Sequence, residues 1–135
     1  MRRMPNDNEF INSPFRGPGG VDIVSKTNPL HHYLWGNNCD GWTLVDKNDL
    51  SVKLESMPAG TEEALHYHEY AQQFFFILKG VADFEIEGSR ITVNKNQGIH
   101  INPQEKHRII NGSDEELEFI LCSQPSTQHD RHNIA

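Results

Sequence analysis

Short apolar segments separated by turn residues run from residue 33 to residue 123, and this pattern constrains the fold more than any other feature of the chain. No stretch keeps the 3.6-residue periodicity of an amphipathic helix. Gly80, Gly88, Asn96 and Gly112 fall between the segments, where they tolerate the positive φ that tight turns require. The pattern predicts an all-β chain, closed into a barrel or jelly roll, with strands at 33–36, 42–46, 50–57, 72–79, 81–87, 90–93, 98–101, 107–111 and 117–123.

The predicted strand at 72–79 is apolar on both of its faces. Phe75 and Ile77 point one way while Phe74, Phe76 and Leu78 point the other way, because successive side chains alternate across a strand. The interior of a barrel buries only one of these faces. The other face needs a cover, either the N-terminal arm or a second copy of the chain, and we therefore predict a homodimer.

The length of 135 residues fits a single domain. The first thirty residues are rich in proline, glycine and asparagine, which predicts an extended arm over residues 1–30. The barrel is expected over residues 31–125. Residues 126–135 are predicted to form a polar tail, in which His129 and His132 are exposed to solvent.

The charge pattern and the cysteines narrow the classes of function. The formal net charge is −7 and the basic residues form no cluster, so no nucleic-acid partner is expected. The longest apolar run, at residues 74–78, is far shorter than the roughly 20 residues that cross a bilayer, so no membrane association is expected. Cys39 and Cys122 lie outside any CxxC spacing, which indicates reduced thiols and a cytoplasmic location.

Two histidines, His66 and His68, are separated by a single residue. On a strand both side chains project from one face, with Tyr67 on the other face, so the two imidazoles can share a metal ion. Taken alone the pair is a weak signal, because solvent-exposed histidines are common and eight histidines occur in this chain.

A longer frame surrounds this pair: Gly60, five residues, His66, one residue, His68, four residues, Gln73, six residues, Gly80, and further on His107, three residues, Asn111. The frame resembles the two sequence motifs of the cupin superfamily, over roughly residues 50 to 125. The resemblance implies a single-domain cupin β-barrel, that is, a double-stranded β-helix or jelly roll. It also implies one metal ion held by His66, His68, Gln73 and His107.

The frame departs from the cupin pattern at several positions. The expected glutamate ligand is Gln73, and Asn96, Asn102 and Gln104 stand where the second motif has glycine, proline and glycine. Asn96 can still adopt the turn conformation that glycine would provide.

Three imidazoles and one amide oxygen make a donor set for a divalent transition metal, zinc or iron first, with nickel, manganese, cobalt or copper as alternatives. Because Gln73 carries no charge, the site keeps the full +2 charge of the metal, which makes the metal a stronger electrophile. The alternative is that Gln73 marks a metal-free site held together by hydrogen bonds among buried polar groups.

The resemblance implies a metal-dependent enzyme that acts on a small oxygen-bearing organic substrate, as a dioxygenase, an isomerase or a cyclase. Some polyketide cyclases in the superfamily resemble this site in using three histidines and one glutamine. Two alternatives stay open: a non-catalytic module that binds a small molecule or a sugar, and a metal-free structural cupin. No catalytic residue beyond the metal ligands is assigned from the sequence.

Three glutamates, Glu62, Glu63 and Glu69, flank the histidine pair. They are candidates for a general base or for orienting His66 and His68. The favoured interpretation is that they are solvated carboxylates at strand ends.

Overall fold

The computed structural model of the chain describes residues 15–16 and 22–134, and all regular structure within these residues is β-strand. This part of the chain contains no helix that could cross a membrane. The strands are β1 (Phe15–Arg16), β2 (Asp22–Ile23), β3 (His31–Trp35), β4 (Cys39–Lys47), β5 (Leu50–Met57), β6 (Thr61–Glu62), β7 (His66–His68), β8 (Gln72–Lys79), β9 (Ala82–Ile86), β10 (Ser89–Val93), β11 (Gly98–Ile101), β12 (His107–Asn111), β13 (Leu117–Gln124) and β14 (Arg131–Asn133).

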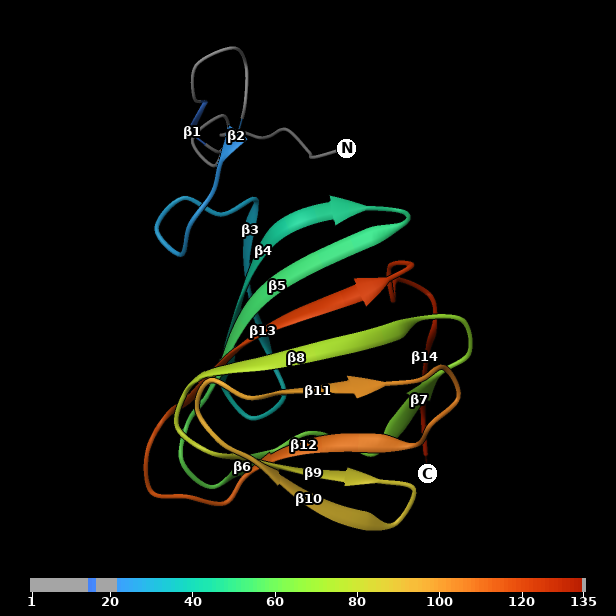
Figure 1. Cartoon of the computed structure of the whole chain (residues 1–135). Helices are drawn as coiled ribbons and strands as arrows, with labels where there is room; N and C mark the ends of the chain where they lie inside the picture. The colour runs from blue at the N-terminus through green and yellow to red at the C-terminus, as the bar shows by residue number, and fades with distance from the viewer. Residues whose placement is uncertain (1–14, 17–21, 135) are drawn as a thin grey trace.

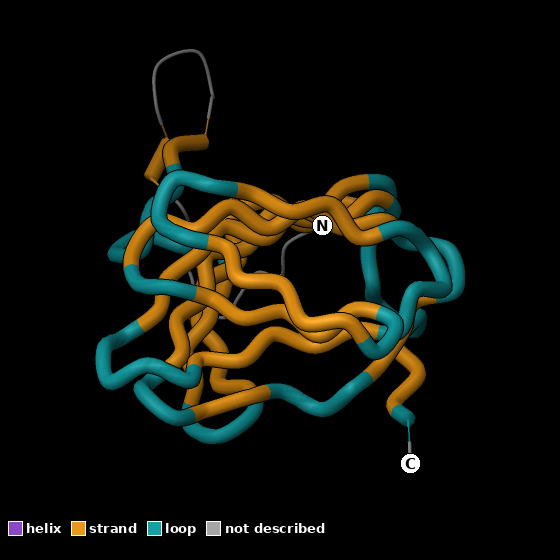
Figure 2. Tube along the Cα trace, turned by 60° about the horizontal axis from the view of Figure 1, so that its bottom comes forward, coloured by secondary structure: helices purple, strands orange, loops and turns teal. Residues whose placement is uncertain are grey.

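Within the described residues, strands β1 and β2 pair only with each other, and the other strands form two antiparallel sheets that face each other across the interior (Figures 1 and 2). The first sheet has the order β11-β8-β13-β5-β4-β3, and the second has the order β10-β9-β12-β7-β14, with β6 pairing to β12. All nine predicted strands are present, with bounds that differ by at most three residues. The all-β jelly-roll architecture predicted from the sequence is therefore confirmed.

The interior changes from apolar to polar along the barrel. Phe75, Phe84 and Phe119 pack together, with Phe75 at ring-centroid distances of 5.0 and 5.5 Å from the other two. Further along the same inner face, Gln73 of β8 lies opposite Ser123 of β13. The aromatic core therefore holds the sheets together over part of their length and leaves a buried polar region where β8 begins.

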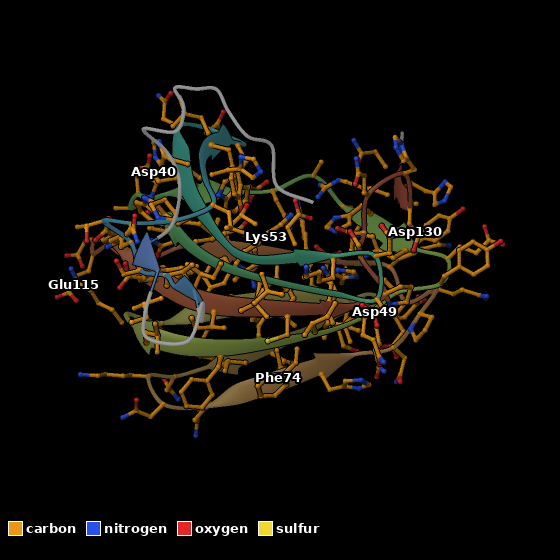
Figure 3. All side chains as sticks on the ribbon, turned by 90° about the horizontal axis from the view of Figure 1, so that it is seen from above. Asp40, Asp49, Lys53, Phe74, Glu115 and Asp130 are labelled. Carbon is orange, nitrogen blue, oxygen red and sulfur yellow. The ribbon has the colours of Figure 1, made fainter. Side chains whose placement is uncertain are left out.

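Strand β8 has the two apolar faces that the sequence predicts. Phe75 and Ile77 are buried in the core, at 3% and 0% exposure. Phe74, on the other face, is 42% exposed and stacks on Phe76 at a centroid distance of 6.5 Å (Phe74 is labelled in Figure 3). The inner face is the one that the barrel covers.

Three of the four turn residues, Gly80, Gly88 and Asn96, have the positive φ that the sequence predicts, whereas Gly112 does not. Asn96, which replaces a glycine of the motif, has a φ of +66°. Gly80 has a φ of +84°, and a Cβ atom at this position would lie 2.6 Å from the carbonyl oxygen of Glu116. Gly80 is therefore required both by the backbone conformation and by the close approach of the neighbouring chain.

Most of the arm predicted over residues 1–30 lies outside the described residues. Two contacts join the described part of the arm to β4: the Leu30 N–H donates to the Thr43 carbonyl at 2.9 Å, and the Lys26 Nζ lies 4.7 Å from the Trp42 ring centroid. At the other end, the segment expected to be a polar tail contributes β14, which pairs with β7 and extends the second sheet. The His132 side chain remains 43% exposed, as expected.

Candidate metal centre

Strand β7 presents its two histidines to the interior. His66 and His68 are 2% and 4% exposed, whereas Tyr67 between them faces outward and stacks on His132 at a centroid distance of 4.9 Å. Because side chains alternate across a strand, residues separated by one position share a face, and both imidazoles project from the same wall.

The third histidine reaches this wall from a distant part of the chain. His107 on β12 lies directly opposite His66 on β7, and residues paired in this way point to the same face of a sheet. Its ring centroid lies 4.4 Å from that of His66 and 5.6 Å from that of His68. One ring nitrogen from each of the three histidines can be chosen so that all three lie within 4.8 Å of one another.

Gln73 completes the group from the opposite sheet. Its side chain is 5% exposed, and its Nε2 donates to the Ser123 Oγ at 3.0 Å. Its Oε1 lies 3.2 Å from the His107 Nε2. Because Ser123 holds the amide nitrogen, the carbonyl oxygen faces the histidines, which is the orientation that a metal ligand needs.

Backbone carbonyls orient two of the imidazoles. The Nδ1–H of His66 donates to the Ala64 carbonyl at 2.8 Å, and the Nδ1–H of His107 donates to the Glu105 carbonyl at 2.8 Å. Each ring therefore carries its proton on Nδ1 and has its Nε2 lone pair free for the interior. The structure thus brings all four residues of the sequence frame together, with the donor atoms pointing at a common volume.

Burial keeps these histidines neutral. Desolvation, with a smaller effect of the neighbouring His107, lowers the pKa of His66 to about 3 and that of His68 to about 4. Desolvation also lowers the pKa of His107. Neutral imidazole is the form that binds a metal ion, so no proton has to leave at neutral pH.

These pKa shifts predict that acid destabilises the metal-free protein. The pKa of a histidine in the unfolded chain is about 6.5, so below about pH 7 the unfolded state binds more protons and stability falls as pH is lowered. His66 and His68 are each expected to lower the free energy of unfolding by about 1 kcal/mol between pH 7 and pH 5.5. Urea unfolding at both pH values measures the loss, and equal stability at the two values would contradict the prediction.

One glutamate near the histidines is not the solvated carboxylate that the sequence analysis favoured. The Glu63 side chain is only 10% exposed, its Oε1 accepts the Ile109 N–H at 3.2 Å, and its Oε2 lies 3.5 Å from the Arg131 Nη1. Burial raises the pKa of Glu63 to about 7, although Arg131 acts against this. The burial of Glu63 depends on the tertiary structure, because β12 and β14 both cover this side chain.

The raised pKa of Glu63 means that the folded state binds a proton more readily than the unfolded state, which stabilises the folded state as pH falls and so opposes the effect of the histidines. Glu63→Gln is therefore expected to steepen the loss of stability in acid.

A second buried carboxylate lies on the inner face of β5. Glu55 is 7% exposed, and its Oε2 accepts a hydrogen bond from the Tyr33 Oη at 2.5 Å. Burial raises the pKa of Glu55 and also that of Tyr33. Neither residue of this pair stands out in the sequence, because Val52 and Leu54, which alternate with Glu55 on β5, look like the core-facing residues.

The comparison with known families decides the classification. The family model described as Cupin domain (Cupin_2) matches residues 53–123, which is more than half of the chain and includes all four residues of the candidate site. This chain belongs to the cupin family. Relatives of this cupin include an uncharacterised protein of Methanocaldococcus jannaschii, 28% identical over 78 residues, and the polyketide synthase CurC of Streptomyces cyaneus, 28% identical over 81 residues.

These matches cover 58% and 56% of this cupin, and they span 62% and 53% of the two relatives. Solved structures resemble it over more of its length. A predicted oxalate decarboxylase from Thermotoga maritima has a TM-score of 0.71 at 20% identity, covering 77% of this chain and 99% of that one. KdgF from Halomonas sp. has a TM-score of 0.70 at 13% identity, covering 78% and 94%. At these identities the structures demonstrate a shared fold.

Proposed function

We propose that this cupin is a metal-dependent enzyme that acts on a small oxygen-bearing organic substrate. The observation that carries the proposal is the convergence of three neutral imidazole nitrogens and one amide oxygen on a buried volume. His66, His68, Gln73 and His107 would hold a divalent transition metal, with zinc or iron as the first candidates. The donor set fits such an ion, because nitrogen and amide oxygen ligands suit transition metals better than calcium or magnesium.

A bound metal would supply Lewis acidity or, as iron, oxygen activation. The chain's own residues supply orientation and proton transfer. Ser123 holds the Gln73 amide in place, and the carbonyls of Ala64 and Glu105 hold two imidazoles. Glu63 is the buried group best suited to exchange a proton near neutral pH, since its pKa is raised to about 7.

Similarity to the polyketide synthase CurC supports the cyclase branch of this proposal. That relative is 28% identical over 81 residues, and cyclisation of an oxygen-rich chain fits a Lewis-acid site with a neutral ligand set. Dioxygenase and isomerase chemistry remain the other branches.

Both described cysteines are free thiols, which supports a reducing, cytoplasmic location.

Elemental analysis of protein purified without an affinity tag tests the metal directly. We expect one zinc or iron per chain, and we expect a chelator to lower the melting temperature because a ligand that binds only the folded state stabilises it. Bound iron with oxygen uptake would indicate a dioxygenase, and bound zinc without it an isomerase or cyclase. Metal-free protein with unchanged stability in chelator would contradict the proposal, and tight ligand binding without turnover would favour the non-catalytic binding module.

We also propose a homodimer built on the outer face of the first sheet. In register across β8, β13 and β5 this face carries Phe74, Cys122 and Val52 in one row and Phe76, Ile120 and Leu54 in the next. None of these side chains is charged. A second copy is the occupant we favour, because a two-fold interface needs a patch that complements itself, and an uncharged apolar face does so despite the net charge of −7 on each chain.

Light scattering after size-exclusion chromatography is expected to give the mass of a dimer for the parent protein and of a monomer for Phe74→Glu. Tyr70→Glu is the matched control, because Tyr70 is also exposed, at 69%, but lies outside this face. A parent protein that is monomeric at micromolar concentration would contradict the dimer.

A further inference from the structure

A cavity of about 450 Å³ opens where the edge strand of one sheet faces the edge strand of the other. Ala64, which lines it, accepts the Nδ1–H of His66 and so joins the cavity wall to the candidate metal centre. Trp35, at the end of β3, lines one side. Glu63, Ala64 and Arg131 line the other side. The volume lies within the range of about 300–1,000 Å³ that is typical of small-molecule sites.

Arg131 faces the same interior as the histidines. In the pairing of β14 with β7, Arg131 lies opposite His68 and Asn133 lies opposite His66. Opposed residues of an antiparallel pair share a face, so the guanidinium and the imidazoles project from one wall. The positive charge of Arg131 contributes to the lowered pKa of all three histidines, so its electrostatic field reaches the candidate metal centre.

The end of the Arg131 side chain is held loosely. Its Nε donates to the Asn133 Oδ1 at 2.9 Å, whereas its Nη1 and Nη2 lie 3.5 Å from the Glu63 Oε2 and the Ala64 carbonyl oxygen. A guanidinium has five N–H donors, and charge-assisted bonds to a carboxylate are normally about 2.7–2.9 Å long. The Arg131 side chain is 40% exposed and lines the cavity, so a ligand in the cavity can approach it.

Two carboxylates, Glu62 and Glu63, line the cavity together with Arg131. Glu62 pairs with Arg108 at 3.0 Å. Glu63 lies 3.5 Å from Arg131 and also accepts the Ile109 N–H, and burial raises its pKa to about 7, so it neutralises Arg131 only in part. The four candidate metal ligands carry no charge. A bound divalent ion would therefore add its full charge on the same side of the barrel.

We infer that Arg131 binds a carboxylate group of the substrate, so that the substrate of this cupin is a small organic carboxylate whose apolar part lies against Trp35. The inference rests on the proposed function and deepens it, because it assigns the charge class of the substrate and the residue that recognises it. Arg131 belongs to the C-terminal strand, outside the residues 53–123 that match the cupin family.

Trp35 provides the readout. The chain has two tryptophans, and Trp42 lies away from the cavity against His32, at a centroid distance of 5.5 Å, and Lys26. The Trp42→Phe variant therefore keeps Trp35 as its one tryptophan. Its fluorescence would be followed while the zinc-loaded and the zinc-free protein are titrated with malonate, a small dicarboxylate, or with malonamide, its neutral counterpart.

We expect saturable binding of malonate by the zinc-loaded protein and at least about tenfold weaker binding of malonamide, the fold-change that loss of one charge-assisted hydrogen bond produces. Arg131→Gln is expected to weaken malonate binding at least about tenfold, and Arg131→Lys less, because it keeps the charge. Arg90→Gln is the matched control, since Arg90 is 60% exposed on β10 and pairs with Asp83.

Two results would overturn the inference: equal affinity of the parent for malonate and malonamide, or unchanged malonate affinity in a folded, zinc-loaded Arg131→Gln variant. The first comparison requires no substitution at Arg131. Made on the zinc-free protein, where no metal ion can bind malonate, it tests Arg131 even if that variant does not fold. The zinc content of each sample separates the two proposals. If zinc does not bind, the proposed function fails, while malonate titration of the zinc-free protein still tests Arg131.

Discussion

Replacing His107 with alanine is expected to weaken zinc binding by more than about a hundredfold, because removing a direct ligand exceeds the 10–100-fold loss typical of removing an outer contact. The His107 ring lies 4.4 Å from that of His66 and 5.6 Å from that of His68 between centroids, and its Nε2 lies 3.2 Å from the Gln73 Oε1. Competition with a zinc-chelating dye measures the affinity, and elemental analysis measures the zinc retained after purification.

Two further variants make this experiment specific. His100→Ala is the matched control, since His100 is an exposed histidine on β11 whose Nε2 lies 2.8 Å from the Gln72 Oε1 on the outer side of the sheet, and zinc affinity should not change. Gln73→Glu should retain zinc, because it restores the carboxylate found in the usual cupin motif. If His107→Ala kept the parent affinity, the metal centre would not be where we place it.

Replacing Asp130 with alanine is expected to lower the free energy of unfolding by about 4 kcal/mol, since it removes three charge-assisted hydrogen bonds. The Asp130 carboxylate accepts the backbone N–H groups of Glu69, Tyr70 and Ala71 at 2.9, 3.1 and 3.0 Å (Asp130 is labelled in Figure 3). Burial alone would raise the pKa of Asp130, but these N–H groups lower it. The residue ties the start of β14 to the connection between β7 and β8.

Urea unfolding at pH 7 measures this effect. Asp49→Ala serves as the control, because Asp49 lies exposed in the turn between β4 and β5 and its replacement should change stability by less than about 0.5 kcal/mol. Asp130→Asn should fall between the two, since it keeps one acceptor oxygen without the charge. A loss of less than 1 kcal/mol in Asp130→Ala would show that the loop and β14 are held by other contacts.

Much of the fold follows from local features of the sequence. The alternation within 72–79 predicts a strand with two apolar faces, and Gly80 and Asn96 mark turns that need a positive φ, as the structure confirms. The end of the barrel near residue 125 was harder to predict from the sequence. Residues 131–133 look like part of a polar tail because an edge strand buries little and carries no apolar pattern.

The sequence by itself determined that His66 and His68 share a face, because the two-residue period of a strand is a property of the backbone and does not depend on the rest of the fold. The motif spacing pointed to His107 and Gln73 through a family resemblance. Only the tertiary structure decided that Glu63 and Glu55 are buried and that Arg131 faces the histidines. These placements depend on which strands pair and in which register, and such pairings join residues more than fifty positions apart through contacts that no local pattern encodes.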